Sequence, residues 1–506
     1  MHQVLLIDET LRAILEFCLD SGKGSLCCVA RCCKAWKDPA LDCIWRNLPS
    51  AVPLMAILPG FSFHAETIVR CIICEHPHNF NPLMQKLEKT LRGENLATFI
   101  AYANRVQYIS FRHQIEASPD IWSCLYKPGY LLPNLQDCYI GDAAVRDLRF
   151  CTSLSPRLRK VSLNVGYATS EPASASMHGA LSQFRDNHAL RCLAVRGYNT
   201  TCLRQPFSAL VALQSLRVHL SILTESTFIA ISSLPLLSDL DIYATSLSFE
   251  RLSSTVIDHC GRSGPFFRSL QSLKIRAQLS VIELILQHLP RNNLLSLHMD
   301  IDNGAHSIPW HSILLTIAAA SSQLHELVLE DILLIDDPRN NQLYPPDNVL
   351  TVDNLRLLSK HPIRRLLLDV SFVPDLTDAV IEEMVAWWPS LESLHLGLDD
   401  ALENMQPTWQ PKMTLASLCA LGKGCRQLTD LIIPLDVASA VSQMPCIEHR
   451  QLSHMGISSR SKPNPDLPTF LTTLFPCLRE VTPGYVGDHC DAWEVVQDKL
   501  ERLRIL

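Results

Sequence analysis

The sequence lacks several features that would place it in a common class. Only 19% of its 506 residues are charged and the net charge is -7, so no basic surface for nucleic acid is indicated. No apolar run approaches the roughly 18 residues of a membrane span. The N-terminus has no basic region, and Asp8 and Glu9 interrupt its first apolar run, unlike a signal peptide. We therefore expect an intracellular protein, cytoplasmic or nuclear, without membrane or nucleic-acid partners.

Motifs for catalysis and for cofactors are also missing. There is no Gly-x-Ser-x-Gly elbow, and residues 22–25 lack the upstream glycine of a phosphate-binding loop. Histidines such as His298 and His395 have no assignable nucleophile or orienting acid. Segment 71–78 holds two cysteines and two histidines, but structural zinc usually needs a second, distant pair, so we interpret it as a buried strand. The sequence predicts no catalytic residue, no cofactor site and no metal ligand.

Cysteine, by contrast, is abundant, with 19 residues. Because no export signal is present, we do not expect a disulfide framework. Most cysteines occupy apolar positions of the sequence pattern, as Cys192 and Cys425 do. We expect them to be small buried hydrophobic residues.

One short pattern recurs through most of the chain: apolar, two variable residues, apolar, one variable residue, apolar. Ten good copies begin at Leu158, Leu190, Leu213, Leu237, Leu270, Leu294, Leu324, Ile363, Leu391 and Leu428. Weaker copies begin at Val106, Leu135 and Leu478. The shorter intervals, 23 or 24 residues, fit a repeat of one strand and one helix, and the longer ones imply insertions.

Helical patterns lie between these strand motifs, for example at 281–289, 313–320 and 379–387. Several helices are expected to stop at a proline two residues before the motif, because proline ends a helix. These prolines are Pro133, Pro156, Pro235, Pro389 and Pro476. One strand–helix unit cannot bury its own apolar face, so neighbours must stack around a continuous core. The predicted fold class is α/β, an irregular solenoid with a parallel sheet on its concave side.

This stretch resembles leucine-rich repeats, particularly the irregular repeats of F-box proteins. The consensus asparagine or cysteine after each strand is missing, and mostly polar residues such as Asp302 and Asp436 take its place. Segments 336–348, 399–413 and 447–468 carry proline, asparagine and aspartate, which predict long loops. Such loops are either functional or flexible filler.

The first 48 residues form a separate pattern of three short helices. An apolar stripe marks the first helix up to Phe17, and residues 26–36 form the second. The third is expected to begin after Asp38 as N-cap, with Pro39 at its first position. So small a core usually needs a partner or a neighbouring domain.

Residues 6–17 resemble the start of an F-box, and Cys32-Cys33-Lys34-Ala35-Trp36 resembles its later signature, in wording similar to fungal F-box proteins. The family's usual proline is Ile7 here, and its usual valine is Cys32. F-boxes bind a Skp-family adaptor, which links them to a cullin-RING ubiquitin ligase. The resemblance implies that the F-box core and its adaptor face include Leu6, Ile7, Ile14, Leu15, Val29, Cys33, Trp36 and Leu41. Alternatively, these residues only cap the solenoid.

The expected organisation therefore has four parts. They are an F-box at 1–48, a connector of mixed helix and loop at 49–100, the leucine-rich-repeat solenoid at 101–490 and a C-terminal capping helix at 491–506.

Alternation along each strand directs its variable residues to the concave face. These residues are mostly basic in the early repeats and turn acidic at Asp300, Glu330 and Asp369. We hypothesise that an acidic segment of a partner binds the basic group, because arginine pairs suit carboxylates and phosphates. This group is Arg196, Arg217, Lys274 and Arg276. The alternative is a solvated surface with no specific ligand.

These observations predict a binding protein and not an enzyme. The resemblance implies the substrate receptor of a Skp-cullin-F-box (SCF) type ubiquitin ligase, with an unknown protein as substrate. The alternative is a leucine-rich-repeat scaffold for protein–protein interaction that has no link to a ligase.

Overall fold

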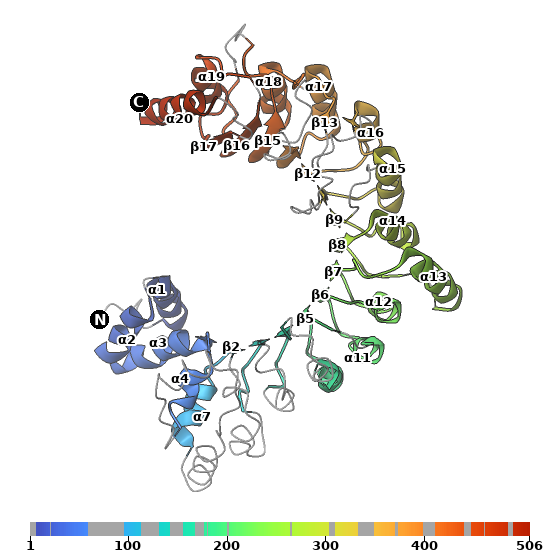
Figure 1. The fold of residues 1–506 in the computed structure, drawn as a ribbon. Helices are drawn as coiled ribbons and strands as arrows, with labels where there is room; N and C mark the ends of the chain where they lie inside the picture. The colour runs from blue at the N-terminus through green and yellow to red at the C-terminus, as the bar shows by residue number, and fades with distance from the viewer. Residues whose placement is uncertain are drawn as a thin grey trace. The chain divides into compact units, whose positions relative to one another are not determined.

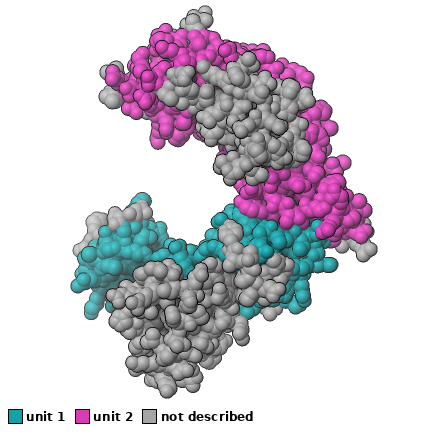
Figure 2. All heavy atoms as spheres, in the orientation of Figure 1, with its two compact units in different colours: residues 1–237 teal, residues 238–506 magenta. Residues whose placement is uncertain are grey.

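The structure is a computed structural model. It describes residues 7–20, 22–58, 96–112, 131–141, 155–166, 177–179, 181–199, 202–263, 266–302, 309–331, 349–369, 373–397, 410–439, 447–459, 461–483 and 489–505. The chain forms two compact units, residues 1–237 and 238–506 (Figure 2).

The first unit begins with three helices and continues as a parallel sheet (Figure 1). The N-terminal helices are α1 (Asp8–Asp20), α2 (Lys23–Cys32) and α3 (Lys34–Arg46). The strands are β1 (Asn47–Leu48), β2 (Tyr108–Phe111), β3 (Asp137–Ile140), β4 (Lys160–Asn164), β5 (Cys192–Gly197) and β6 (Ser215–Leu220). The shorter helices are α4 (Val52–Met55), α7 (Ala97–Ala103), η4 (Phe184–Asp186), α11 (Arg204–Ser208) and α12 (Glu225–Ser232). Neighbouring strands pair in chain order.

The second unit repeats the same strand–helix order with longer helices (Figure 1). Its main sheet pairs β7 (Asp239–Tyr243), β8 (Ser272–Ala277), β9 (Ser296–Ile301), β10 (Glu326–Asp331), β12 (Arg365–Asp369), β14 (Ser393–Leu396), β15 (Asp430–Pro434), β16 (His454–Ser458) and β17 (Glu480–Pro483), all parallel and in chain order. A second small sheet pairs β11 (Val349–Leu350) with β13 (Val373–Pro374). The helices are α13 (Phe249–Ser263), α14 (Leu279–His288), α15 (Trp310–Ala320), α16 (Val352–Arg356), α17 (Asp378–Trp387), α18 (Leu415–Gly424), α19 (Leu467–Leu474) and α20 (Cys490–Ile505).

Alternation along the strands creates one face for the core and one for solvent. In β6, Leu216, Val218 and Leu220 are buried, whereas Arg217 between them is exposed. The buried residues pack toward the helices, and the alternating residues form what we call the open face of each sheet. The apolar positions of the predicted motif are therefore the core positions, and the α/β leucine-rich-repeat fold is confirmed.

Three of the five prolines follow the end of a described helix, as predicted, and the segments before Pro133 and Pro156 lie mostly outside the described residues. Helix α12 ends at Ser232 before Pro235, α17 ends at Trp387 before Pro389, and α19 ends at Leu474 before Pro476. The three helical segments predicted at 281–289, 313–320 and 379–387 correspond to α14, α15 and α17. None of the helices in these described stretches is long and apolar enough to cross a bilayer.

One predicted loop is wrong. Segment 447–468 was expected to be an insertion, but it contains β16 and the start of α19. Leu452, Met455 and Ile457 are buried and follow the repeat pattern, with Leu452 24 residues after Leu428 and 26 before Leu478. The interval of 50 residues therefore holds a complete repeat. Segment 336–348 and most of 399–413 lie outside the described residues, as does segment 71–78.

The start of the third helix is also wrong. Helix α3 begins at Lys34 after an extended Cys33, so Asp38 is not its N-cap and Pro39 lies inside the helix. The extended backbone of Cys33, with φ -157° and ψ 161°, has already ended α2. Pro39 is buried, and its missing N–H removes one hydrogen bond of the early part of α3.

Burial of most cysteines is not found among those that the structure describes, although Cys425 is buried as expected. Among the described cysteines only Cys43, Cys138 and Cys425 are buried, and Cys192 is half-buried. The exposed ones are Cys27, Cys28, Cys32, Cys202 and Cys477. Helix α2 accounts for three of them, because only Leu26 of this helix is fully buried and Cys27, Cys28 and Cys32 lie on its exposed side.

Candidate functional site

The three N-terminal helices, which we call the helical module, have a small core of their own. Leu11, Leu15, Leu26, Ala40 and Cys43 are buried together between α1, α2 and α3. Five buried side chains are few for three helices, so the module needs a neighbour for stability.

The residues that the F-box resemblance selects divide into two groups. Leu15 is buried in the core, Val29 and Trp36 pack against it, and Cys33 and Leu41 are half-buried. Ile7 and Ile14, by contrast, are 49% and 41% exposed. Leu6 lies outside the described residues.

An exposed apolar side of α1 includes one residue that the sequence analysis did not select. Phe17 is 78% exposed and follows Ile14 by three positions, which places both on one side of the helix, and Ile7, directly before the helix, is also exposed. The spacing could have revealed it, since Phe17 belongs to the stripe already visible in the sequence. We call Ile7, Ile14 and Phe17 the α1 patch.

Ion pairs attach the helical module to the first repeat. Arg105, which follows α7, binds the carboxylate of Asp38 at 2.6 Å and its backbone oxygen at 3.1 Å, and it also contacts Asp42. Arg12 binds the other oxygen of Asp42 at 3.0 Å. The Arg105 side chain is 19% exposed and that of Asp42 31%, so this pair is partly shielded from solvent, whereas Asp38 is 73% exposed. Together with the pairing of β1 to β2, they fix the module against the sheet.

The predicted basic residues on the first unit are neighbours on its open face. Arg196 on β5 and Arg217 on β6 are both exposed. Their strands pair so that Arg196 lies opposite His219, and Arg217 lies opposite Ala194. The two arginines are therefore diagonal neighbours across adjacent strands.

The two basic residues on the second unit are held by local contacts. Arg276 on β8 stacks on the ring of Tyr243, with its guanidinium 5.4 Å from the ring centroid. Lys274 Nζ lies 3.2–3.3 Å from the ring nitrogens of His298 and 3.9 Å from the carboxylate of Asp300. Both side chains are half-buried, whereas Arg196 and Arg217 are exposed.

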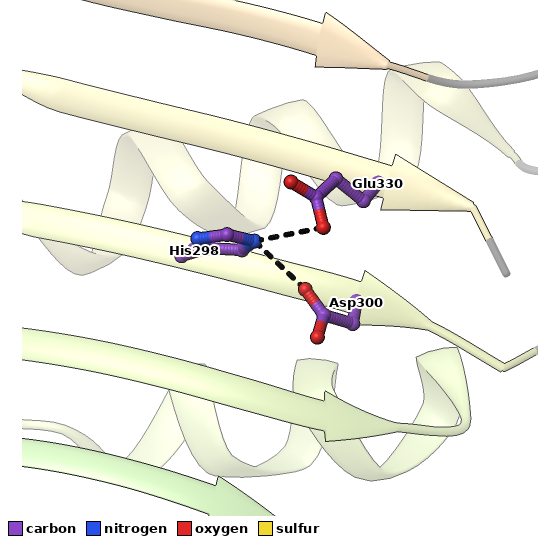
Figure 3. A group of neighbouring side chains, drawn as sticks. All are labelled: His298, Asp300 and Glu330. Atoms are coloured by element: carbon purple, nitrogen blue, oxygen red, sulfur yellow. Dashed lines mark ion pairs between the residues drawn. The ribbon is translucent and has the colours of Figure 1, made fainter.

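Next to Lys274, three ligand-type side chains converge on the open face (Figure 3). His298 Nε2 lies 2.8 Å from Asp300 Oδ1 and 3.1 Å from Glu330 Oε2. Burial lowers the pKa of His298, but its contacts with Asp300 and Glu330 outweigh burial and hold that pKa above its ordinary value. Burial also raises the pKa of Asp300, but contacts with His298 and Lys274 bring it below its ordinary value.

A second histidine, His395, also has an acid partner, contrary to the sequence analysis. Its Nε2 contacts Asp430 Oδ2, which lowers the pKa of Asp430, and Ser393 Oγ lies 3.4 Å from the same nitrogen. A Ser–His–Asp relay needs the acid on one ring nitrogen and the serine on the other. Because both groups meet Nε2, this cluster does not have the geometry of a hydrolase triad.

Comparisons with known proteins find only distant structural similarity. No family model matches the sequence, and no curated protein matches it. Similar solved structures include the Rad7–Elc1 complex of yeast, at 16% identity over 90% of this chain and 93% of that one, with a TM-score of 0.35. Others are a leucine-rich-repeat protein of Leptospira interrogans (16% identity, 76% and 98% coverage, TM-score 0.34) and an internalin of Listeria monocytogenes (14%, 70% and 88%, 0.27). At such identities and TM-scores, no function is transferred from them.

Proposed function

We propose that this chain is the substrate receptor of an SCF-type ubiquitin ligase. The helical module binds a Skp-family adaptor, and the open face of the repeats binds the protein to be modified. The chain itself is not an enzyme in this proposal, because the ubiquitin chemistry belongs to the other subunits. The observation that carries the proposal is the α1 patch on a module that otherwise resembles an F-box in sequence.

The patch supports docking because Phe17 and Ile14 are exposed on a helix that already has a buried side. If the helical module had no binding partner, polar residues would be expected at these solvent-facing positions. Aromatic residues such as phenylalanine are enriched at protein interfaces relative to the rest of the surface. The Arg105 contacts support the proposal further, since they hold the adaptor-binding helices in a fixed position relative to the first strands.

The test is co-purification with a Skp-family adaptor from the same source. The variant Ile14→Asp/Phe17→Asp replaces two of the three α1 patch residues and leaves the buried core unchanged. Its matched control is Leu315→Asp, a substitution of a 51% exposed leucine on α15. We expect the native chain and the control to form a stable complex with the adaptor. The double variant should bind at least about 30-fold more weakly, which is the effect of losing one strong interface residue.

The alternative is a leucine-rich-repeat scaffold whose N-terminal helices only cap the sheet. The Arg105 contacts are consistent with this alternative too, because a capping module must be attached to the first repeat. A native chain that is folded by circular dichroism, yet binds no adaptor, would leave the scaffold as the better account. Equal binding by the native chain and the double variant would remove the α1 patch from the interface.

For the substrate, we propose that an acidic segment binds the first unit at Arg196 and Arg217. These two side chains are exposed and adjacent, whereas Lys274 and Arg276 are half-buried against residues of the second unit. The variant Arg196→Glu/Arg217→Glu should release proteins that the native adaptor-bound chain retains, and Arg159→Glu, at another exposed arginine, should not. Retention of the same proteins by the double variant would reject this surface.

A further inference from the structure

The group His298, Asp300 and Glu330 is built by strand geometry. His298 and Asp300 are two residues apart on β9, so both side chains leave the same face of the strand. Glu330 on β10 lies directly opposite Asp300 in the parallel register. Both strands pair on either side within the sheet, so the three backbone positions are fixed.

The side chains converge on one point from these fixed positions (Figure 3). The three candidate ligand atoms, His298 Nε2, Asp300 Oδ1 and Glu330 Oε2, lie within 4.8 Å of one another. Asp300 is only 8% exposed, and its Oδ1 receives no hydrogen bond of good geometry from the described residues, although His298 Nε2 lies close by. A buried carboxylate oxygen that lacks a hydrogen-bond donor is suited to binding a cation.

We propose that His298, Asp300 and Glu330 form a binding site for one divalent transition-metal ion, with zinc as the best match. One imidazole nitrogen and two carboxylate oxygens are ligands that zinc accepts at about 2.0–2.2 Å. Tetrahedral zinc would place these ligand atoms about 3.3 Å apart. The two distances from His298 Nε2, 2.8 and 3.1 Å, need to open by only a few tenths of an ångström.

Three protein ligands leave a fourth position on zinc. Because the group lies on the open face, this position is directed away from the core and takes water or a ligand from a bound protein. Magnesium is a poor match, since it prefers oxygen ligands and retains several waters. The site is independent of adaptor binding by the helical module.

Lys274 gives the proposal a distinctive test. Its ammonium group is 3.2–3.3 Å from the His298 ring and 3.9 Å from Asp300, so its charge opposes a cation at the site. The Lys274 side chain is 37% exposed and can turn toward solvent when the ion binds. Replacing Lys274 with glutamine should therefore tighten metal binding, whereas in a purely structural ion-pair cluster it would only remove a contact.

The experiment measures Zn²⁺ binding to the full chain by calorimetry, after removal of metal with a chelator and in a phosphine reductant. We expect the native chain to bind one more zinc than His298→Gln and Glu330→Gln, or to bind that zinc at least about tenfold more tightly. The control His395→Gln should match the native chain, and Lys274→Gln should bind more tightly. Magnesium at the same concentration should not compete.

Exposed cysteines such as Cys27 and Cys28 can also bind zinc, so a second readout separates them. Co²⁺ at the proposed site should give visible absorption bands without the near-ultraviolet band of a thiolate ligand, and these bands should disappear in His298→Gln. Identical zinc affinity, stoichiometry and cobalt spectra for the native chain and His298→Gln, both folded by circular dichroism, would overturn the proposal. Weaker binding by Lys274→Gln would also contradict it.

Discussion

Asp378 connects two successive helices of the second unit, and its removal gives a sharp test of how the repeats are coupled. The residue begins α17, and its carboxylate accepts hydrogen bonds from the residues that begin α18: Thr414 N at 2.8 Å, Thr414 Oγ1 at 2.8 Å and Ser417 Oγ at 2.5 Å. Ser417 is completely buried, so its hydroxyl cannot find water instead. The variant Asp378→Ala breaks all three bonds at once.

The expected loss of stability follows from these three hydrogen bonds. A hydrogen bond to a charged group contributes about 1.5–3 kcal/mol, but the three share one carboxylate and water can replace part of the loss at Thr414. We therefore expect Asp378→Ala to lower the free energy of unfolding by about 3 kcal/mol, which for a unit of this size lowers the melting temperature by about 6–12 °C. The matched control is Asp375→Ala, which removes a solvent-exposed ion pair with Lys412 and should cost less than about 1 kcal/mol.

Thermal unfolding followed by circular dichroism measures this difference, and hydrogen exchange locates it. Because repeats contact mainly their neighbours, the loss of protection should be greatest in α17 and α18. Equal melting temperatures for Asp378→Ala and Asp375→Ala would refute the idea that this carboxylate couples the two repeats.

The same variant has a predicted pH dependence. Burial raises the pKa of Asp378, but the hydrogen bonds from Ser417 and Thr414 outweigh it, so its pKa in the folded chain is below its ordinary value. A depressed pKa stabilises the fold above the pKa of the unfolded chain, and this stabilisation is lost as pH falls through the folded value. The difference in stability between the native chain and Asp378→Ala should therefore be constant near pH 7 and shrink below about pH 4.

Three further predictions concern packing, thiol chemistry and the attachment of the helical module. A Cβ at Gly424 would lie 1.8 Å from Val385 Cγ1, so Gly424→Ala should cost about 1–3 kcal/mol in urea unfolding, and adding Val385→Ala should recover part of it. Burial raises the pKa of Cys425 to about 11, so iodoacetamide at pH 8 should modify exposed Cys27 in the folded chain and Cys425 only after unfolding, as mass spectrometry would show. Arg105→Ala should increase hydrogen exchange in α1–α3 while leaving the second unit unchanged, and unchanged exchange throughout would show that the ion pairs contribute nothing.

The positions of the strands could be predicted from the sequence because the residues that they bury follow a regular apolar pattern. Each motif presents three apolar residues at positions that face the core, and a shift by one residue would expose all of them. The repeat at β16 was missed for a different reason. Its middle apolar position is Met455 in place of the more common leucine, and the motif lies near several prolines, which are typical of loops. The regular spacing to Leu428 and Leu478 was a better guide than local composition.

The start of α3 could not be predicted from capping preferences. Asp38 followed by Pro39 is a typical helix start, but the helix had already begun four residues earlier, where α2 ended at Cys33. The tertiary contacts of the module determine this boundary: Asp38 binds Arg105, and Trp36 packs on the core shared by all three helices. Local preference is weak compared with such contacts.

The contacts of His298 could be predicted from the sequence only in part. Aligning the motif copies at Leu294 and Leu324 gives an offset of 30 residues, which places Glu330 beside Asp300, as the strand register shows. The sequence therefore predicts that Asp300 and Glu330 are neighbours on the same face of the sheet. The direction in which the His298 imidazole points could not be predicted, because it depends on contacts with Lys274 and with both carboxylates. A repeat therefore predicts which side chains can meet, and the charges among them decide which contacts form.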